Sequence, residues 1–386
     1  MTRIRKGKVM RIEQIRTRRA VGLACMALLA SAAMWRILPS AEPATAVAID
    51  HSQVMSFLDE EGNEQPVRTP KDWQHRRKQI IEGMEEAMGP LPDRSSLPPL
   101  DMRIDETVEA KNHTRLKITF LSEGTDRVPA YLFLPKNRQG KAAAMLCLHQ
   151  TTPSGKGEIS GLGGMPTRRY AVELAERGYV TLAPDYPSFG DYAYDFSADS
   201  YVSGTMKGIS NHMRAVDLLE GLDEVDPRRI GVIGHSLGGH NSMFVAVFDE
   251  RLKVIVSSCG WTPFADYYEG KIKGWTSDRY MPRLRDKYGL DPARVPFDFY
   301  EVVAALAPRT FFSCSPLHDD NFEVEGVRKA IPVAAEVYKL LGAEDQLQVR
   351  YPDCPHDFPP VVRREAYEFL DKALGHTPTE GATIVE

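Results

Sequence analysis

Short runs rich in apolar residues recur from residue 143 onward, and they alternate with longer segments in which apolar residues return every three or four positions. The short runs are residues 143–148, 180–183, 230–234, 254–258, 310–315 and 346–351, and the longer segments are residues 167–177, 208–222, 324–341 and 361–374. Runs of the first kind are typical of strands buried on both faces, and the wider spacing is typical of amphipathic helices. The pattern therefore predicts an α/β fold, with a mostly parallel central sheet and helices on both faces.

Two further elements are expected ahead of these. Thr69-Pro70 provides a helix N-cap followed by proline at the first helical position, and a helix with one apolar face then continues to Gly89. Residues 116–121 and 128–134 favour edge strands joined in a hairpin. Residues 47–68 are polar and lack clear periodicity, so a linker is expected there.

One apolar run ends abruptly in small residues around a single serine, Gly234-His235-Ser236-Leu237-Gly238. The pattern predicts a strand, a sharp turn that carries Ser236, and a helix that continues to about Val247. Small residues at 234 and 238 suit a turn too tight for a Cβ. A serine hydroxyl is a weak nucleophile near neutral pH, so it needs an imidazole to take its proton and a carboxylate to orient that imidazole.

Both groups are found after later strands. Asp319 follows the run 310–315, and His356 follows the run 346–351. Because reactive groups collect at the carboxyl ends of parallel strands, we expect the three loops to converge. The sequence predicts Ser236 as nucleophile, His356 as general base and then acid, and Asp319 as the orienting carboxylate.

Several neighbouring residues are alternatives or bystanders. Asp320 competes for the acid role, because the distance from the strand end does not separate adjacent residues. His235, His240 and His318 are interpreted as structural, and Asp357 as a residue that stabilises its own loop.

An oxyanion needs two fixed N–H donors. The residue after the serine, Leu237, is expected to supply one. The other is expected from the loop after residues 143–148, with Gln150 as the candidate and Thr151 as the alternative.

The distribution of charge along the chain limits which partners and which cellular compartment are expected. Residues 1–36 carry nine Lys/Arg and one Glu, which leaves the remainder with a formal net charge of minus 13. An acidic body argues against nucleic acid as a partner. The basic start, the uncharged residues 20–35 and the Ala-rich sequence that follows have the order of a signal peptide, with an uncleaved anchor as the alternative. Export to the periplasm or medium is therefore expected, with contact to a membrane only through an uncleaved leader.

No Cys/His cluster has the spacing of a metal site, so neither a metal nor another cofactor is expected. Cys147, Cys259, Cys314 and Cys354 remain after the leader and are interpreted as buried free thiols. A Cys314–Cys354 bridge is the alternative, because the two residues lie on consecutive strands and an oxidising compartment would permit it.

With these residues placed, residues 69–374 resemble the dienelactone hydrolase and acetylxylan esterase-like branch of the α/β-hydrolase superfamily, which is related to prolyl-oligopeptidase-like catalytic domains. The matching stretches are Met88-Gly89-Pro90-Leu91-Pro92, Leu148-His149-Gln150-Thr151, Gly234-His235-Ser236-Leu237-Gly238-Gly239, Cys259-Gly260-Trp261, Pro316-Leu317-His318-Asp319 and His356-Asp357-Phe358-Pro359. Dienelactone hydrolases proper use cysteine as nucleophile, so Ser236 departs from them.

The resemblance implies an exported serine carboxylesterase that forms an acyl-enzyme, acting on acyl or methyl esters of carbohydrates. A prolyl-oligopeptidase-like serine peptidase is the alternative. The aromatic-rich stretch from residue 261 lies where such hydrolases insert a lid, and Trp261, Tyr267 and Tyr268 are the expected substrate contacts.

The expected organisation has four parts. Residues 1–46 form the leader, residues 47–95 the linker and N-terminal helix, residues 96–376 the catalytic domain with a lid-like insertion at about 261–305, and residues 377–386 a tail.

Overall fold

The computed structural model describes residues 49–136, 138 and 140–385. The chain divides into the units Met1–Ala46 and Val47–Glu386, and every described residue belongs to the second. The predicted leader thus lies outside the described residues. No helix in the described part of the chain combines the length and the apolar character needed to cross a bilayer.

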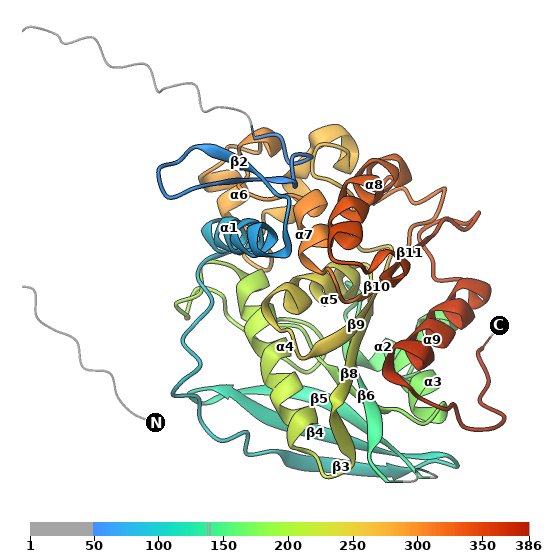
Figure 1. Cartoon of the computed structure of the whole chain (residues 1–386). Coiled ribbons are helices and arrows are strands. Elements are labelled where there is room, and N and C mark those ends of the chain that lie inside the picture. The colour runs from blue at the N-terminus through green and yellow to red at the C-terminus, as the bar shows by residue number, and fades with distance from the viewer. Residues whose placement is uncertain (1–48, 137, 139, 386) are drawn as a thin grey trace, which may run out of the picture. The chain divides into compact units, whose positions relative to one another are not determined.

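The larger sheet of the described chain has nine strands (Figure 1). They are β3 (Arg103–Glu109), β4 (His113–Glu123), β5 (Asp126–Pro135), β6 (Ala142–Leu148), β7 (Val180–Pro184), β8 (Val225–His235), β9 (Leu252–Ser258), β10 (Thr310–Cys314) and β11 (Leu347–Arg350). Their order across the sheet is β11-β10-β9-β8-β6-β7-β5-β4-β3. The six strands from β11 to β7 run parallel, and β5, β4 and β3 add antiparallel to one edge. The predicted fold class is confirmed.

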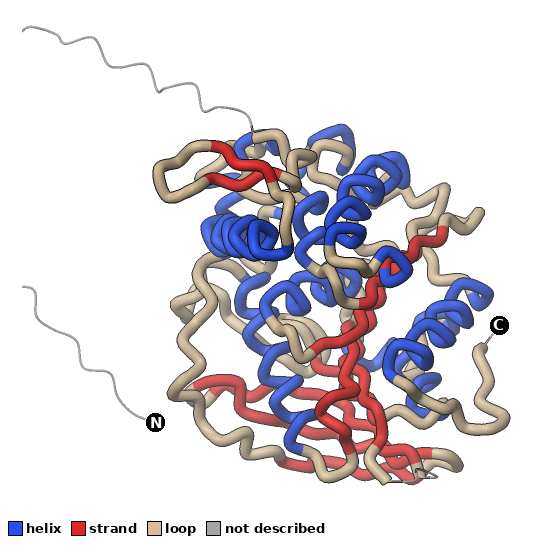
Figure 2. The backbone as a smooth tube through the Cα atoms, in the orientation of Figure 1, coloured by secondary structure: helices blue, strands red, loops and turns tan. Residues whose placement is uncertain are grey.

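Helices cover both faces of this sheet (Figure 2). On one face pack α4 (Gly204–Gly221) and α5 (Leu237–Phe248), with α1 (Pro70–Met88), α7 (Phe299–Ala305) and α8 (Val324–Leu340) in the same hydrophobic cluster. On the other face pack α2 (Lys156–Ile159), α3 (Tyr170–Glu176) and α9 (Pro360–Leu374). Side chains of β6 alternate between the two clusters, Leu146 in the first and Cys147 in the second, because successive residues of a strand point to opposite faces.

Helix α1 begins as the sequence predicts. The hydroxyl of Thr69 accepts a hydrogen bond from the Asp72 amide, the Asp72 carboxylate accepts one from the Thr69 amide, and Pro70 occupies the first turn. The apolar face of α1 is buried in the main core, as at Ile80 and Met84.

The described part of the segment expected to be a linker, residues 49–68, contains secondary structure instead. It contains the two-stranded hairpin of β1 (Ser56–Leu58) and β2 (Glu64–Pro66), and its His51 forms a 2.7 Å ion pair with Glu301 of α7. Strands of three residues are too short to show an alternating pattern, so they could not be predicted from the sequence.

The carboxyl-terminal residues also pack against the body. The Val385 amide donates to Glu173 of α3, and Arg363 of α9 donates to the Val385 carbonyl. Ile384 lies against the second hydrophobic cluster. The expectation of a separate tail at residues 377–386 does not describe this stretch.

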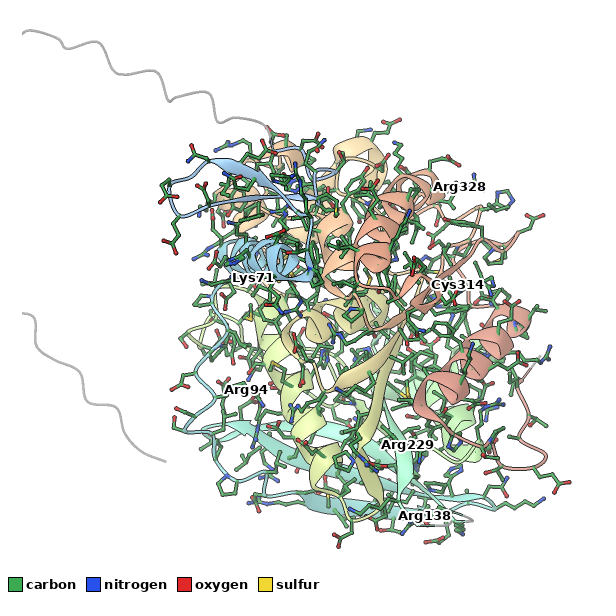
Figure 3. The ribbon with its side chains drawn as sticks, viewed as in Figure 1. Lys71, Arg94, Arg138, Arg229, Cys314 and Arg328 are labelled. Atoms are coloured by element: carbon green, nitrogen blue, oxygen red, sulfur yellow. The ribbon has the colours of Figure 1, made fainter. Side chains whose placement is uncertain are left out.

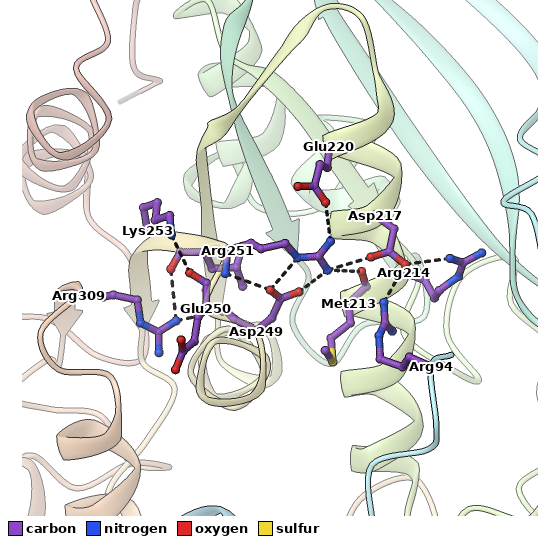
Figure 4. Close-up of polar contacts among 11 residues, drawn as sticks. Arg94, Met213, Arg214, Asp217, Glu220, Asp249, Glu250, Arg251, Lys253 and Arg309 are labelled. Carbon is purple, nitrogen blue, oxygen red and sulfur yellow. Dashed lines mark hydrogen bonds and ion pairs between the residues drawn. The ribbon is translucent and has the colours of Figure 1, made fainter. Parts of the chain in front are cut away.

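A network of charged side chains ties α4 to the turn between α5 and β9 (Figure 4). Arg251 pairs with Asp217, Glu220 and Asp249 at 2.7 to 2.8 Å, and Arg94 reaches Asp217 at 2.7 Å. The network lies at the amino end of β9. Ser236 follows the carboxyl end of β8, so the network and the serine lie at opposite ends of the parallel strands.

Candidate active site

Ser236 stands at the turn between β8 and α5 in a backbone conformation that side chains rarely adopt, with φ 54° and ψ −118°. The Ser236 amide donates to the Ser258 carbonyl at 2.8 Å, which fixes the turn against β9. A Cβ at Gly238 would collide with the carbonyl oxygen of Leu148, and a Cβ at Gly234 would collide with that of Gly238. The strained serine and the two obligatory glycines are the features of a nucleophile turn.

His356 and Asp319 form a hydrogen-bonded pair. Nδ1 of His356 lies 2.9 Å from each carboxylate oxygen of Asp319. The amides of Asn321 and Phe322 also donate to Asp319 Oδ1, both at 2.9 Å, so the buried carboxylate is held in place. Because an ionised carboxylate only accepts hydrogen bonds, Nδ1 of His356 carries the proton and Nε2 is left with its lone pair, as a general base requires.

Asp320, the alternative acid, is exposed. The loops that carry the acid and the histidine are joined directly, since the Leu317 amide donates to the Pro352 carbonyl at 2.9 Å and the His318 amide to the Cys354 carbonyl at 3.2 Å. His318 adds a 2.7 Å contact to Asp353 at the surface. These bonds hold the two loops together, and they leave His318 on the outside of the site.

The loop of His356 is anchored from its other side. Arg168 donates to the His356 carbonyl at 2.9 Å, and the Asp357 carboxylate accepts from Thr167 at 2.9 Å and from Arg168 at 3.3 Å. Asp357 thus ties the histidine loop to the segment before α3, which is a structural role.

His356 is brought to the serine turn by ring contacts. The ring of His235, the residue before Ser236, lies 4.9 Å from the His356 ring, and Phe322 stacks on His356 at 6.0 Å while also lining the pocket at Ser236. Burial, with a smaller effect of the Arg168 charge, holds the pKa of His235 far below its usual value. His235 therefore stays neutral beside the pair.

The Ser236 hydroxyl makes no hydrogen bond to another described residue. Hydrogen bonds of catalytic groups are often long in the unliganded state and tighten when substrate binds. The structure brings His356 and Asp319 together, and it places Ser236 in a pocket that is also lined by Phe322, the ring stacked on His356. Transfer of the serine proton to His356 remains a prediction.

Two backbone amides are the candidates for binding an oxyanion. Leu237 is the first residue of α5, so its N–H has no partner within the helix. In the loop after β6, Nδ1 of His149 lies 2.7 Å from the Gln150 carbonyl oxygen, and Nε2 accepts from the Tyr186 amide at 2.9 Å. Gln150 and Thr151 are joined by a trans peptide bond, in which the carbonyl and the N–H point in opposite directions. Because the Gln150 carbonyl points at the His149 ring, the Thr151 amide points away from that ring.

Thr151 lines the pocket at Ser236, so this geometry favours the Thr151 amide over that of Gln150 as the second donor. The Gln150 side chain is buried, and neither of its amide atoms has a partner among the described residues. These contacts of His149 were not predicted from the sequence, where a histidine at the end of an apolar strand was the available sign.

The pocket at Ser236 has a volume of about 80 Å³. It is lined by Thr151, Ser236, Leu237, His240, Tyr267, Gly274, Trp275, Tyr280, Asn321 and Phe322. Of the expected substrate contacts, Tyr267 is in this lining. Tyr268 is exposed at its rim and donates to Asn321 at 3.3 Å. Trp261 is 1% exposed and donates to Ser313, so it belongs to the core and offers no surface to a substrate.

A larger hollow of about 730 Å³ lies near the amino ends of the parallel strands. Two arginines of its lining, Arg138 and Arg229, are labelled in Figure 3. Arg229 is held by the carbonyls of Leu374 and Gly375 at the end of α9. Reactive groups of parallel sheets collect at the carboxyl ends of the strands, and this hollow lies at the amino ends. The smaller pocket, which contains Ser236, is therefore the candidate site.

All four described cysteines are free, so the alternative of a Cys314–Cys354 bridge is not realised. Within the described residues, Cys259, Asp319 and His356 form a group whose ligand atoms lie within 4.8 Å of one another. Burial raises the pKa of the Cys259 thiol well above its usual value, and the thiol donates to the Asp357 carbonyl at 3.2 Å. A metal ion would bind the thiolate form of Cys259, and burial disfavours that form. The three residues therefore fit a metal ion poorly, and Cys259 is a buried thiol packed next to the Asp319–His356 pair.

The chain is similar to known hydrolases in sequence and in fold. The model of the alpha/beta hydrolase family matches residues 159–380. "Putative hydrolase YtaP" of Bacillus subtilis (strain 168) is 30% identical over 315 residues, which cover 78% of this chain and 99% of that relative.

Solved structures of glucuronoyl esterases are similar in fold. One from Solibacter usitatus has a TM-score of 0.65 and 19% identity, covering 82% of this chain and 96% of its own. A carbohydrate esterase family 15 member from Caldicellulosiruptor kristjansonii has a TM-score of 0.62 and 20% identity, covering 83% and 89%.

Proposed function

This chain belongs to the alpha/beta hydrolase family, and from that membership we propose that it is a serine hydrolase that cleaves carboxylic esters of carbohydrates through an acyl-enzyme. The observation that carries the proposal is the Asp319–His356 hydrogen-bonded pair beside the pocket that contains Ser236. It is the arrangement by which a hydroxyl loses its proton at neutral pH.

In the proposed first step, Nε2 of His356 takes the proton of Ser236 as Oγ attacks the ester carbonyl carbon. The negative charge that develops on the carbonyl oxygen is stabilised by the amides of Leu237 and Thr151. His356 then protonates the departing alcohol, and Asp319 stabilises the imidazolium formed in between. In the second step His356 activates a water that releases the acid from Ser236.

Carbohydrate esters suit the walls of the pocket. Tyr267, Trp275 and Phe322 present aromatic surface on which the C–H face of a sugar ring can pack. The hydroxyls of Thr151 and Tyr280, 3.3 Å apart, offer hydrogen bonds. The names of the glucuronoyl esterases with the same fold support the same substrate class. Export through a leader at residues 1–46 is part of this proposal, because polymeric carbohydrate esters lie outside the cell.

The test uses the purified protein with acetylated xylan, glucuronate methyl ester and p-nitrophenyl acetate. We expect turnover of esters, with an early burst of p-nitrophenol that does not exceed one equivalent of enzyme. Ser236→Ala should reduce turnover to background, and Ser197→Ala, at an exposed serine, should retain the wild-type rate. Full activity in Ser236→Ala would reject the proposal, and faster cleavage of peptide amides than of acyl esters would favour the peptidase alternative.

A further inference from the structure

His240 lies one helical turn after Ser236, and its amide donates to the Ser236 carbonyl at 3.2 Å. Its side chain is 7% exposed, and that small surface is part of the pocket at Ser236. The mechanism proposed above does not use this imidazole. A buried polar ring in the wall of a reactive pocket therefore needs its own explanation.

The hydrogen bonding of His240 fixes which nitrogen carries the proton. Nδ1 lies 3.2 Å from the carbonyl oxygen of Gly260, which can only accept. Burial lowers the pKa of His240 to about 3, so the ring is neutral at any pH at which the protein would work. Nδ1 is therefore the N–H donor, and Nε2 is an acceptor with a free lone pair.

Nε2 of His240 has no hydrogen-bond partner in the described part of the chain. The His240 ring packs among three aromatic rings, with centroid separations of 4.7 Å to Trp275, 5.6 Å to Phe244 and 6.4 Å to Phe322. The pocket is the side from which a donor can reach this nitrogen, and a ligand that fills the pocket without offering a donor would leave the acceptor unpaired.

We propose that Nε2 of His240 accepts a hydrogen bond from a hydroxyl group of the substrate, so that the pocket selects hydroxylated esters over alkyl esters of the same shape. The inference rests on the proposed esterase function and names a residue that sets its specificity. A substrate hydroxyl at this point donates a hydrogen bond to Nε2. A deoxygenated analogue would exclude solvent from Nε2 without offering a donor, so the acceptor would be left without a hydrogen bond. Sites built to pair a substrate hydroxyl reject the analogue that lacks it for this reason.

The surrounding rings decide the shape of the group that is selected. Trp275 and Phe322 line the pocket together with His240, so a group that reaches Nε2 also lies against aromatic surface. A saturated ring that carries hydroxyls at its edge and C–H groups on its face meets both conditions. An alkyl chain meets only the second.

The experiment compares two methyl esters of the same ring, methyl glucuronate and methyl tetrahydropyran-2-carboxylate, which lacks the hydroxyls. We expect the wild-type enzyme to prefer the hydroxylated ester at least tenfold in kcat/KM. His240→Phe, which keeps an aromatic ring and removes the acceptor, should reduce this ratio at least tenfold, mainly through KM. His240→Gln, whose amide oxygen can accept, should retain part of the preference.

His376→Phe is the matched control. His376 lines the larger hollow near the amino ends of the strands, so its substitution should leave the ratio unchanged. A wild-type ratio below three overturns the inference without any variant, and so does an equal ratio in the wild type and His240→Phe. In either case hydrolysis of both esters would leave the proposed function standing. A wild-type enzyme that hydrolyses no ester would remove the proposed function and this inference together.

Discussion

At the scale of single residues, the chemistry depends on which ring nitrogen each histidine protonates. Asp319 accepts from Nδ1 of His356, which keeps the proton on Nδ1 and leaves Nε2 free, and the Gly260 carbonyl does the same for His240. His149 also carries its proton on Nδ1, because its Nε2 accepts from a backbone amide. The hydrogen bonds of His356, His240 and His149 thus favour the same tautomer in all three, with the proton on Nδ1.

The acid is the residue that fixes the tautomer of the base. Replacement of Asp319 by Asn should lower kcat by about 1,000- to 10,000-fold, because the amide can present a donor to Nδ1 and favour the wrong tautomer. Asp320→Asn, at the exposed neighbouring position, is the matched control and should stay within a few-fold of wild type. Steady-state hydrolysis of p-nitrophenyl acetate measures both. Equal losses in the two variants would contradict the assignment of Asp319.

His149 has a positioning role that the same assay can test. Its ring joins the Gln150 carbonyl to the Tyr186 amide, so His149→Ala should release the peptide that carries the Thr151 amide. Loss of one oxyanion donor costs about 100- to 1,000-fold in rate. We expect a fall in kcat of at least tenfold with KM changed by less than threefold. A rise in KM with kcat unchanged would mean that the ring serves binding instead.

Single residues also mark how far sequence reasoning reached. The residue types of the three loops pointed to Ser236, Asp319 and His356, because each follows its own predicted strand. The sequence did not separate Asp319 from Asp320, since that choice depends on side-chain direction within one loop. The interpretation of Trp261 as a substrate contact was wrong for a related reason: an aromatic residue in a lid segment can face the core as readily as the pocket.

At the scale of elements, the parallel strands and long helices were predicted to within a few residues. Their signal is strong because both faces of the sheet are buried. Strand β3 was missed, since most of its side chains are exposed and it shows no apolar pattern. The segment expected as a helix at residues 167–177 begins with a 3₁₀ turn, Pro166–Arg168, and α3 starts only at Tyr170.

The start of α7 carries a pH dependence of stability. Asp298 caps this helix and accepts from the amides of Phe264 and Phe299, and burial raises the pKa of its carboxyl to about 7. Between about pH 4 and 7 the folded protein holds a proton that the unfolded chain releases. The contribution of Asp298 to the free energy of unfolding should therefore fall as pH rises through this range.

Asp298→Asn isolates that contribution, because asparagine is an equally good N-cap that does not ionise. Urea unfolding at pH 5, 6, 7 and 8 should show the variant gaining stability relative to wild type as pH rises. A constant difference between the two proteins across these pH values would show that Asp298 is already ionised at pH 5.

At the scale of the whole molecule, the amino-terminal helix is part of the catalytic body in the unit Val47–Glu386. Arg76 of α1 pairs with Glu301 at 2.5 Å, and Arg77 donates to the carbonyls of Ala305 and Val247. A Cβ at Gly83 would collide with the Pro296 carbonyl oxygen, so helix and body are in close contact. The sequence predicted that the apolar face of α1 would be buried, and the polar contacts that complete the docking join residues more than 150 positions apart, which no local pattern records.

Substitution in α1 should therefore destabilise the body as a unit. Met84 is fully buried, and Met84→Ala should lower the free energy of unfolding by about 2–5 kcal/mol. Lys78→Ala, on the exposed face of the same helix, should change it by less than about 0.5 kcal/mol. Chemical unfolding followed by tryptophan fluorescence and by residual ester hydrolysis should give coincident midpoints for each variant. Loss of fluorescence signal with the hydrolysis midpoint unchanged would make α1 an independent appendage.

Covalent labelling tests the central claim, that Ser236 is a nucleophile activated by His356, most directly. A fluorophosphonate should add once to the wild-type protein, with the adduct mapped by mass spectrometry to the peptide that contains Ser236. Ser236→Ala should not be labelled, and His356→Ala should be labelled at least a hundredfold more slowly. Labelling of another residue, or equal labelling rates in wild type and His356→Ala, would contradict the account.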